Sequence, residues 1–252
     1  MFSLRGHVAV VTGGSAGLGL GMARGLARCG ADVALWARNP ERLAAAAAEV
    51  SAVGAGGAVL PLACDVSDEE AILRAMAETR ARFGRLDSLF ANAGIARVRP
   101  LLETTLEEYR RQNAVNFEGM LVCFREAARQ MIAQGGGGKL VATSSTAAVC
   151  GSPGLVSYSA TKGAMAAAVR ALAVELGPHG IQVNALLPGV FRTNMTSRVD
   201  QIEERYLPKM PSTFLGTPRH LEGIAAFLAS RESDYLTGTC IPIDGGISVA
   251  AY

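Results

Sequence analysis

The sequence is poor in the features that mark secreted, metal-binding and membrane-spanning proteins. Its five cysteines are scattered, with no CxxC pair and no histidine at metal-ligand spacing, which predicts free thiols rather than a disulfide framework or a metal centre. No run of about 18 uninterrupted apolar residues is present, so no membrane span is expected. The apolar stretch before the first glycines is too short for a secretory signal, and we expect a cytoplasmic protein.

Charge is also scarce. Charged residues make up 18% of the chain, the formal net charge is +2, and no dense block of lysine and arginine occurs. We therefore expect neither nucleic acid nor a membrane surface as a partner. Half of the 252 residues are hydrophobic, which is enough for a sizeable core and excludes a disordered or fibrous chain. The three histidines have no partner at a meaningful spacing and are interpreted as structural.

What the sequence does contain is a regular alternation of short apolar runs and longer segments of helical period. Strands are predicted at residues 7–12, 32–36, 58–63, 88–91, 139–143, 182–187 and 240–243, and helices at 18–29, 40–53, 68–83, 106–134, 157–177 and 218–230. The strands are mostly apolar throughout, as in sheets covered on both faces. We expect one doubly wound α/β domain over residues 1–252, with a mainly parallel sheet and helices on both faces.

Local sequence also predicts where some helices begin. Asn39 before Pro40 places a capping residue ahead of a proline at the first helical position. Ser67 and Glu70 have the spacing of a capping box, which predicts a helix start after Ser67.

A glycine-rich turn follows the first predicted strand and opens the first predicted helix. It contains Gly13, Ser15, Gly17, Leu18 and Gly19, with the glycines in GxxxGxG rather than GxGxxG spacing. Glycines let backbone approach a pyrophosphate closely, and the start of a helix offers free N–H groups and a positive dipole end. The position favours a dinucleotide-binding site, although such a turn on its own is also compatible with a simple connection.

The end of the second predicted strand bears on which nucleotide binds. An NAD site usually carries a carboxylate there, for the adenosine ribose. Residues 35–39 hold no carboxylate but do include Arg38, whose guanidinium suits a 2′-phosphate. NADP(H) is therefore favoured and NAD(H) stays possible, since Arg38 is also compatible with an ordinary exposed arginine.

Tyr158 and Lys162 form the candidate catalytic pair. A separation of four places both side chains on one face of the helix predicted at 157–177. A nearby ammonium favours the phenolate, so we expect Lys162 to lower the tyrosine pKa toward the working range. Ser145 follows the strand predicted at 139–143, at the sheet edge where ligands bind. Surface Tyr–Lys pairs at this spacing are common, so the pair depends on its neighbours for support.

Taken together, these motifs resemble those of the short-chain dehydrogenase/reductase family along nearly the whole chain. The matching segments are the turn at 13–19, Asp65 with Val66, the Asn92-Ala93-Gly94 segment, Asn116, Ser145, Tyr158 with Lys162, and Pro188 and Gly189 with Thr193. Two positions depart from the family pattern. Ala16 stands where many NADP-using members carry a basic residue, and Ala91 replaces the first asparagine of the commoner NNAG.

The resemblance implies a seven-stranded Rossmann sheet and an NAD(P)-dependent oxidoreductase acting on a small alcohol or ketone. It implies a catalytic set of Asn116, Ser145, Tyr158 and Lys162. It also implies cofactor contacts from Gly13, Ser15, Gly17, Leu18, Gly19, Arg38, Asp65, Val66, Asn92, Ala93, Gly94, Tyr158, Lys162, Pro188, Gly189, Val190 and Thr193. A homotetramer built on the helices at 106–134 and 157–177, and a substrate lid at 194–218, are expected from it too.

Within the family, the sequence is similar to sugar or sugar-acid dehydrogenases and equally to 3-oxoacyl-thioester reductases. Two other functions remain compatible with the same scaffold. One is a non-catalytic NAD(P)-binding regulator, and the other is a lyase or epimerase.

Overall fold

The protein is built on one seven-stranded sheet in which every strand pairing is parallel. The computed structural model describes residues 2–193 and 199–250. The strand order is β3-β2-β1-β4-β5-β6-β7, with bounds β1 Val8–Thr12, β2 Asp32–Ala37, β3 Val59–Ala63, β4 Ser88–Ala91, β5 Gly138–Thr143, β6 Ile181–Pro188 and β7 Cys240–Ile243. All seven predicted strands are present, within one residue of the predicted ends, and the doubly wound Rossmann fold is confirmed.

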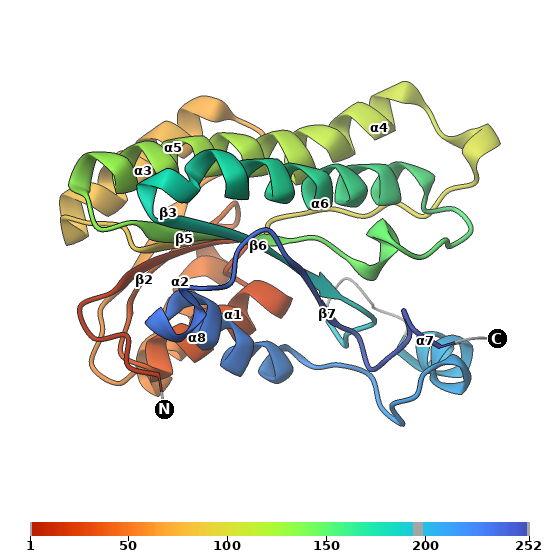
Figure 1. Cartoon of the computed structure of the whole chain (residues 1–252). Helices are drawn as coiled ribbons and strands as arrows, with labels where there is room; N and C mark the ends of the chain where they lie inside the picture. The colour runs from red at the N-terminus through yellow and green to blue at the C-terminus, as the bar shows by residue number, and fades with distance from the viewer. Residues whose placement is uncertain (1, 194–198, 251–252) are drawn as a thin grey trace.

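Helices cover both faces of the sheet, as Figure 1 shows. One layer holds α1 (Gly17–Arg28), α2 (Pro40–Val53) and α8 (Glu222–Ala229), and the other holds α3 (Glu69–Phe83), α4 (Leu106–Asn113), α5 (Gly119–Gln134) and α6 (Val156–Leu176). The short helix α7 (Val199–Tyr206) lies apart from both layers, beyond the sheet edge at the right of the figure. Successive strands are parallel because each returns through a helix on one face.

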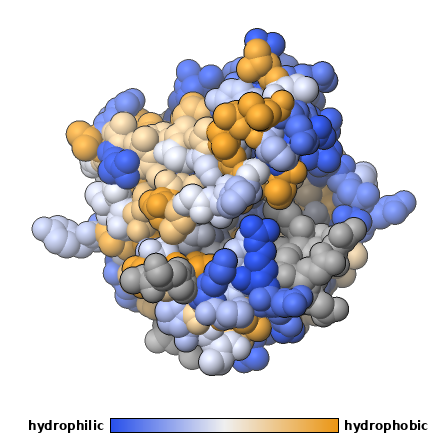
Figure 2. All heavy atoms as spheres, turned by 90° about the vertical axis from the view of Figure 1, so that its right-hand side faces the viewer, coloured by the Kyte–Doolittle hydropathy of each residue, from blue (hydrophilic) through white to orange (hydrophobic). Residues whose placement is uncertain are grey.

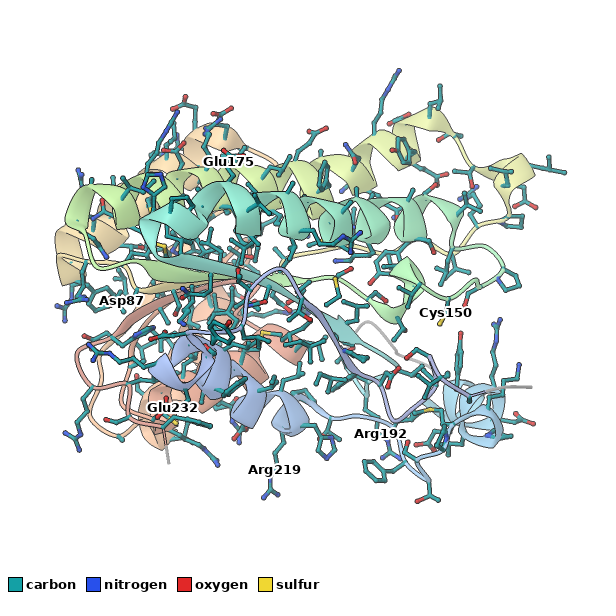
Figure 3. All side chains as sticks on the ribbon, viewed as in Figure 1. Asp87, Cys150, Glu175, Arg192, Arg219 and Glu232 are labelled. Atoms are coloured by element: carbon teal, nitrogen blue, oxygen red, sulfur yellow. The ribbon has the colours of Figure 1, made fainter. Side chains whose placement is uncertain are left out.

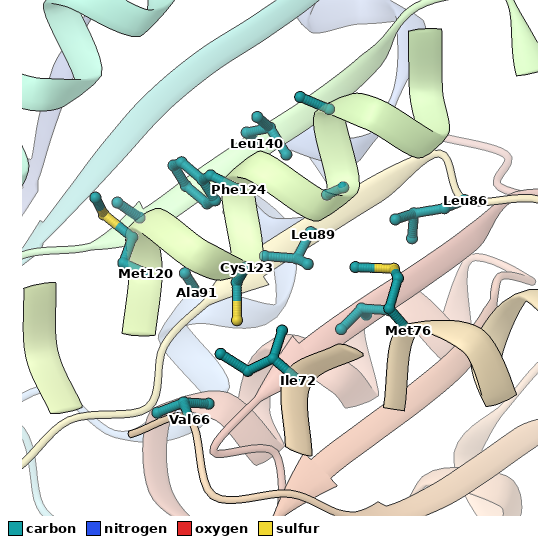
Figure 4. Packing of buried hydrophobic residues seen from close by; sticks show 14 of the residues in the cluster. Val66, Ile72, Met76, Leu86, Leu89, Ala91, Met120, Cys123, Phe124 and Leu140 are labelled. Atoms are coloured by element: carbon teal, nitrogen blue, oxygen red, sulfur yellow. The ribbon is translucent and has the colours of Figure 1, made fainter. Parts of the chain in front are cut away.

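Two hydrophobic clusters, one on each side of the sheet, hold these layers together. The larger one packs α3 and α5 on the central strands, and Figure 4 shows Phe124 of α5 near Leu140 of the sheet and Cys123 of α5 pointing towards Ile72 of α3. The second cluster joins α1, α2 and α8 to the other face through residues such as Met22. Both faces of β1 are thereby buried, which explains why this strand reads as a continuous apolar run.

Several local features differ from the sequence prediction, and α7 is one of them, since no helix was predicted at its residues. The helix predicted at 106–134 is interrupted by a π-helical turn, Ala114–Glu118, between α4 and α5. The helix predicted at 218–230 begins as a 3-10 turn, Pro218–Leu221, before α8. The capping box at Ser67 was wrong: Asp68 caps α3 by accepting from the backbone N–H of Glu70, while the Ser67 hydroxyl donates to Asp65.

The predicted absence of a disulfide framework agrees with the structure. All five cysteines are free thiols. Over residues 2–193 and 199–250, no cluster of three or more metal-ligating side chains occurs. In the same described ranges, no helix has the length and apolar character needed to cross a bilayer.

Candidate active site

A cavity of about 550 Å³ lies at the carboxyl ends of the strands, around the point where β1 and β4 are neighbours. This is the switch point of a doubly wound sheet, since the chain proceeds to opposite sides from these two strands. The cavity is lined by Gly13, Ser15, Ala16, Gly17, Leu18, Ala37, Arg38, Asn39, Arg42, Cys64, Asp65, Val66, Asn92, Ala93, Gly94, Ile95, Val115, Thr143, Ser144, Ser145, Tyr158, Lys162, Pro188, Gly189, Phe191 and Thr193.

Of the predicted site residues, three do not line this cavity: Gly19, Asn116 and Val190. Gly19 is buried behind the turn, where an added Cβ would lie 2.5 Å from the carbonyl oxygen of Gly13. Several lining residues were missed by sequence reasoning. Among them, Arg42 and Thr143 carry polar side chains, and neither belongs to a motif that points to a ligand.

The glycine-rich turn presents backbone donors to the cavity. Ala16, the residue before α1, has no side chain that could cap the helix, so the first N–H groups of α1 have no side-chain acceptor. Gly13 has a positive φ of 64°, a conformation that disfavours other residues. Its Cα leaves room only for hydrogen, since a Cβ there would lie 3.0 Å from Ala93. These features fit a dinucleotide pyrophosphate.

At the far end of the cavity, Arg38 and Arg42 line the wall together with the carboxylate of Asp65. Arg38 follows β2, and its guanidinium lies 3.8 Å from an Asp65 oxygen. Burial raises the pKa of Asp65, but hydrogen bonds from Ser67 and the charge of Arg38 outweigh it and leave the pKa below its ordinary value. Arg42 comes from the first turn of α2, and its backbone N–H donates to the Asn39 side chain. This end therefore combines an anionic group with two cations.

The centre of the cavity is held by a link between β1 and β4. The Thr12 hydroxyl accepts from the backbone N–H groups of Asn92 and Ala93, each at 3.0 Å. The Asn92 amide donates in turn to the Thr12 carbonyl oxygen at 3.1 Å. Next in the chain, Gly94 lies close to Lys162, because a Cβ on Gly94 would be 3.5 Å from Nζ. The Asn-Ala-Gly segment thus connects the glycine-rich turn to the end of the cavity that Lys162 lines.

The hydroxyls of Ser145 and Tyr158 meet at the same end of the cavity as Lys162. Ser145 follows β5, and its Oγ accepts from the Ala147 backbone N–H at 3.1 Å. Its hydrogen bond to Tyr158 opposes the effect of burial, which raises the tyrosine pKa. The net shift is upward, so the phenol is protonated near neutral pH. Two adjacent hydroxyls can both donate hydrogen bonds to one carbonyl oxygen, so this pair is suited to bind one.

Lys162 lies behind this pair in a fully buried position. Its Nζ donates to the Thr143 carbonyl oxygen at 2.7 Å and lies 5.6 Å from the centre of the Tyr158 ring. Desolvation lowers the lysine pKa from 10.5 to about 7. The expected lowering of the tyrosine pKa by the ammonium is not found, because desolvation of the partly buried phenol shifts the Tyr158 pKa upward and Lys162 donates to a backbone carbonyl oxygen instead.

Asn116 lies in the π-helical turn and is completely buried. Its side-chain oxygen accepts from the Ile95 backbone N–H at 2.8 Å, and its amide donates to the Ile95 carbonyl oxygen at 3.0 Å. The same amide donates to the Thr161 hydroxyl, which donates to the carbonyl oxygen of Tyr158. Asn116 therefore joins the segment after β4 to the first turns of α6, where Tyr158 and Lys162 stand.

The substrate side of the cavity opens on the face seen in Figure 2, where apolar side chains gather in the upper part. Exposed apolar residues of the surrounding loops include Val98, Leu101, Leu102 and Val149. Figure 3 shows Cys150 and Arg192 on this same side of the molecule. Arg192 forms an ion pair with Glu203 of α7. Part of the predicted lid, residues 194–198, lies outside the described residues.

The fold and this cavity together define a nicotinamide-nucleotide oxidoreductase of the Rossmann type. A family model described as enoyl-(acyl carrier protein) reductase matches residues 13–248. Gluconate 5-dehydrogenase of Gluconobacter oxydans is 36% identical over 253 residues, covering 99% of this chain and 98% of its own. 2-Dehydro-3-deoxy-D-gluconate 5-dehydrogenase of Dickeya dadantii is 36% identical over 248 residues, covering 97% and 96%.

Solved structures agree. A short-chain type dehydrogenase/reductase from Mycobacterium marinum superposes with a TM-score of 0.95 at 35% identity, covering 98% of each chain. The chain belongs to the short-chain dehydrogenase/reductase family. It is an NAD(P)-dependent oxidoreductase that transfers a hydride between the cofactor and an alcohol or carbonyl carbon.

Proposed function

We propose that this enzyme interconverts a secondary alcohol and a ketone with NADP(H), and that Tyr158 is the general acid and base. The observation that carries the proposal is the contact between the Ser145 and Tyr158 hydroxyls, with buried Lys162 beside them, in the cavity that fits the nucleotide. The cofactor, when bound, supplies or accepts the hydride. Side chains of the protein bind the substrate oxygen, transfer the proton and position the cofactor.

In the reducing direction, the Ser145 and Tyr158 hydroxyls bind the substrate oxygen, and the Tyr158 phenol gives its proton to that oxygen as charge develops. The raised pKa of Tyr158 favours this role, since the proton is present at neutral pH. Alcohol oxidation needs the phenolate and becomes faster as the pH rises. Lys162 is proposed to hold the ribose next to the nicotinamide, and Asn116 to complete the set by positioning α6.

The preference for NADP(H) is supported by the charges at the adenosine end. Both Arg38 and Arg42 line the cavity, and no carboxylate follows β2 at residues 37–39. The single carboxylate beside them, Asp65, already accepts two hydrogen bonds from Ser67. With two arginines and one aspartate in its lining, this end of the cavity keeps a net positive charge that suits a 2′-phosphate.

The substrate is proposed to be a small alcohol or ketone, and the polyhydroxy acids on which two relatives act are the first compounds to test. A homotetramer is also proposed. Helices α4, α5 and α6 keep apolar side chains exposed on one layer, among them Leu106, Ile132 and Val174. Such residues on neighbouring helices suit a contact between copies of the chain. We further propose that residues 194–218 form the lid and that the protein works in the cytoplasm.

Tyr158→Phe tests the assignment of the proton donor. The variant keeps the ring and removes only the hydroxyl, so we expect turnover to fall by about 10³-fold or more while NADPH binding stays within about twofold. Activity is followed at the nicotinamide absorbance band, with NADPH and NADH over a panel of ketones and with NADP⁺ and NAD⁺ over a panel of alcohols that includes gluconate. Turnover of the variant near the wild-type rate would overturn the assignment.

A further inference from the structure

Within the described residues, three buried side-chain atoms form no hydrogen bond: Arg24 Nε, Glu222 Oε1 and Thr143 Oγ1. The first two lie 3.2 Å apart and belong to one ion pair, so each has a partner of opposite charge. Thr143 Oγ1 has no partner of either kind in the part of the chain that the structure describes. A buried hydroxyl is normally hydrogen-bonded within the protein, because losing its hydrogen bonds to water without forming new ones costs free energy.

Thr143 is the last residue of β5 and lies at the catalytic end of the cavity. Its side chain is 5% exposed, and the residue lines the cavity together with Ser145 and Lys162. Its carbonyl oxygen is the acceptor for Lys162 Nζ, at 2.7 Å. Thr143 is therefore fixed directly against the group that is proposed to hold the ribose beside the nicotinamide.

The direction of the Thr143 side chain follows from the strand. Side chains alternate along extended backbone, and Ser145 continues the extended conformation of β5 with φ −169° and ψ 156°. Thr143 thus shares a side with Ser145, whereas Ser144 faces α6 and donates to the Lys162 carbonyl oxygen at 2.8 Å. The unpartnered hydroxyl stands on the side of the strand that carries the catalytic serine.

We propose that Thr143 is a cofactor-binding residue whose hydroxyl forms a hydrogen bond with the nicotinamide half of the bound nucleotide. This inference rests on the proposed function. The nicotinamide ribose and the carboxamide both offer donors and acceptors, and a threonine hydroxyl can act as either. Valine has the same shape as threonine without the hydroxyl and would avoid an unpartnered buried group, so a ligand explains the threonine.

Thr143→Val and Thr143→Ser provide the test and its matched control. NADPH affinity is measured by titrating the enhancement of nicotinamide fluorescence, which needs no substrate. We expect the valine variant to bind NADPH about five- to tenfold more weakly, as for the loss of one hydrogen bond, and the serine variant to stay within about twofold of wild type. Binding of 2′,5′-ADP, which lacks the nicotinamide half, is expected to be the same in all three proteins.

Thermal unfolding gives a second measurement, because a hydroxyl with a purely structural role would change the melting temperature in a different way. Without nucleotide, the valine variant is expected to be at least as stable as wild type, because it removes an unpartnered polar atom. With saturating NADPH, its stabilisation is expected to be smaller than that of wild type. If the valine variant yields no folded protein, Thr143→Ala carries the same comparison.

Three results would overturn the inference: unchanged NADPH affinity in the valine variant, an equal loss of affinity for NADPH and 2′,5′-ADP, or a lower melting temperature without nucleotide. The last would mean that the hydroxyl has a partner within the protein. Failure of the proposed function is distinct, because wild-type protein would then turn over no alcohol or ketone in the panel, whether or not it binds NADPH.

Discussion

Arg38 and Arg42, at the proposed adenosine end of the cavity, differ in whether their charge is paired. Arg38 is held 3.8 Å from the Asp65 carboxylate, which neutralises part of its charge, and 59% of its side chain is exposed. Arg42, fixed at the start of α2 by the bond between its N–H and Asn39, forms no ion pair within the described residues. Discrimination between NADP(H) and NAD(H) is therefore expected to depend on Arg42 as well as on Arg38.

Arg38→Ala and Arg42→Ala test this at the residue scale. On the proposed preference for NADP(H), each variant would lose a charged hydrogen bond to the 2′-phosphate, so we expect NADPH affinity to fall by about 10- to 100-fold while NADH affinity changes by less than about twofold. The control is Arg231→Ala, which removes the same charge from an exposed residue outside the cavity. Equal losses for both nucleotides, or losses in the control, would contradict the prediction.

Residues in motifs could be predicted from the sequence, whereas residues placed by the fold could not. The sequence predicts the positions of Tyr158, Lys162 and Ser145, because a helix places residues four apart on one face and Ser145 follows a predicted strand. Arg42 and Thr143 reach the cavity only because β2 and β5 end at the same sheet edge. The pKa of Tyr158 was predicted with the wrong sign, because burial depends on tertiary packing that no spacing reveals.

At the scale of elements, α1 and α8 cross at very short range. A Cβ on Gly25 of α1 would lie 2.2 Å from the carbonyl oxygen of Glu222, at the start of α8. The Glu222 carboxylate also pairs with Arg24 and Arg28 of α1. Because α1 begins at the glycine-rich turn that lines the cavity, this crossing fixes the helix whose start lies at the cavity.

Gly25→Ala is expected to destabilise the protein by about 1–3 kcal/mol, since the added methyl group would clash with the backbone of Glu222 and force the two helices apart. Gly223→Ala, in α8, is the control. Nothing lies within 4 Å of the position of its Cβ, so the change is expected to stabilise the helix by about 0.5–1 kcal/mol. Urea unfolding measures both, and a neutral Gly25→Ala would refute the close crossing.

Helix and strand positions were predictable at this scale because hydrophobic period and length distinguish them. The π-helical turn Ala114–Glu118 was not, since its residues continue the helical pattern on either side. The turn places Asn116 where its amide bonds Ile95 and Thr161, and these contacts join segments far apart in sequence.

Over the whole molecule, the two edges of the sheet differ in kind. The cavity occupies the carboxyl edge, while the opposite edge, where Figure 3 shows Asp87, holds buried and part-buried charges. There His7 Nε2 lies 3.0 Å from the Ser88 hydroxyl, and Lys139 forms an ion pair with Asp234. Burial lowers the pKa of His7 from 6.5 to about 4, and Arg85 and Lys139 oppose the attraction of Asp87.

This edge predicts a pH dependence of stability. Between pH 6.5 and about 4 the unfolded state binds a proton at His7 that the folded state refuses, so stability falls as the pH falls through this window. His7→Gln cannot take up that proton, and we expect its melting temperature to decline less between about pH 7 and about pH 5. His179→Gln, at an exposed position, should decline as wild type does. Identical slopes for all three proteins would contradict the prediction.

The pairing of β1 with β4 has a consequence for how the chain reaches its native state. Ala9 lies beside Ser88, while every other strand of each half pairs with a neighbour in sequence. Closing a long loop is slow and entropically costly, so we expect the two halves of the sheet to be joined late in folding. A nucleotide held in the cavity, whose lining includes segments that follow both strands, would stabilise this junction between the two halves of the sheet.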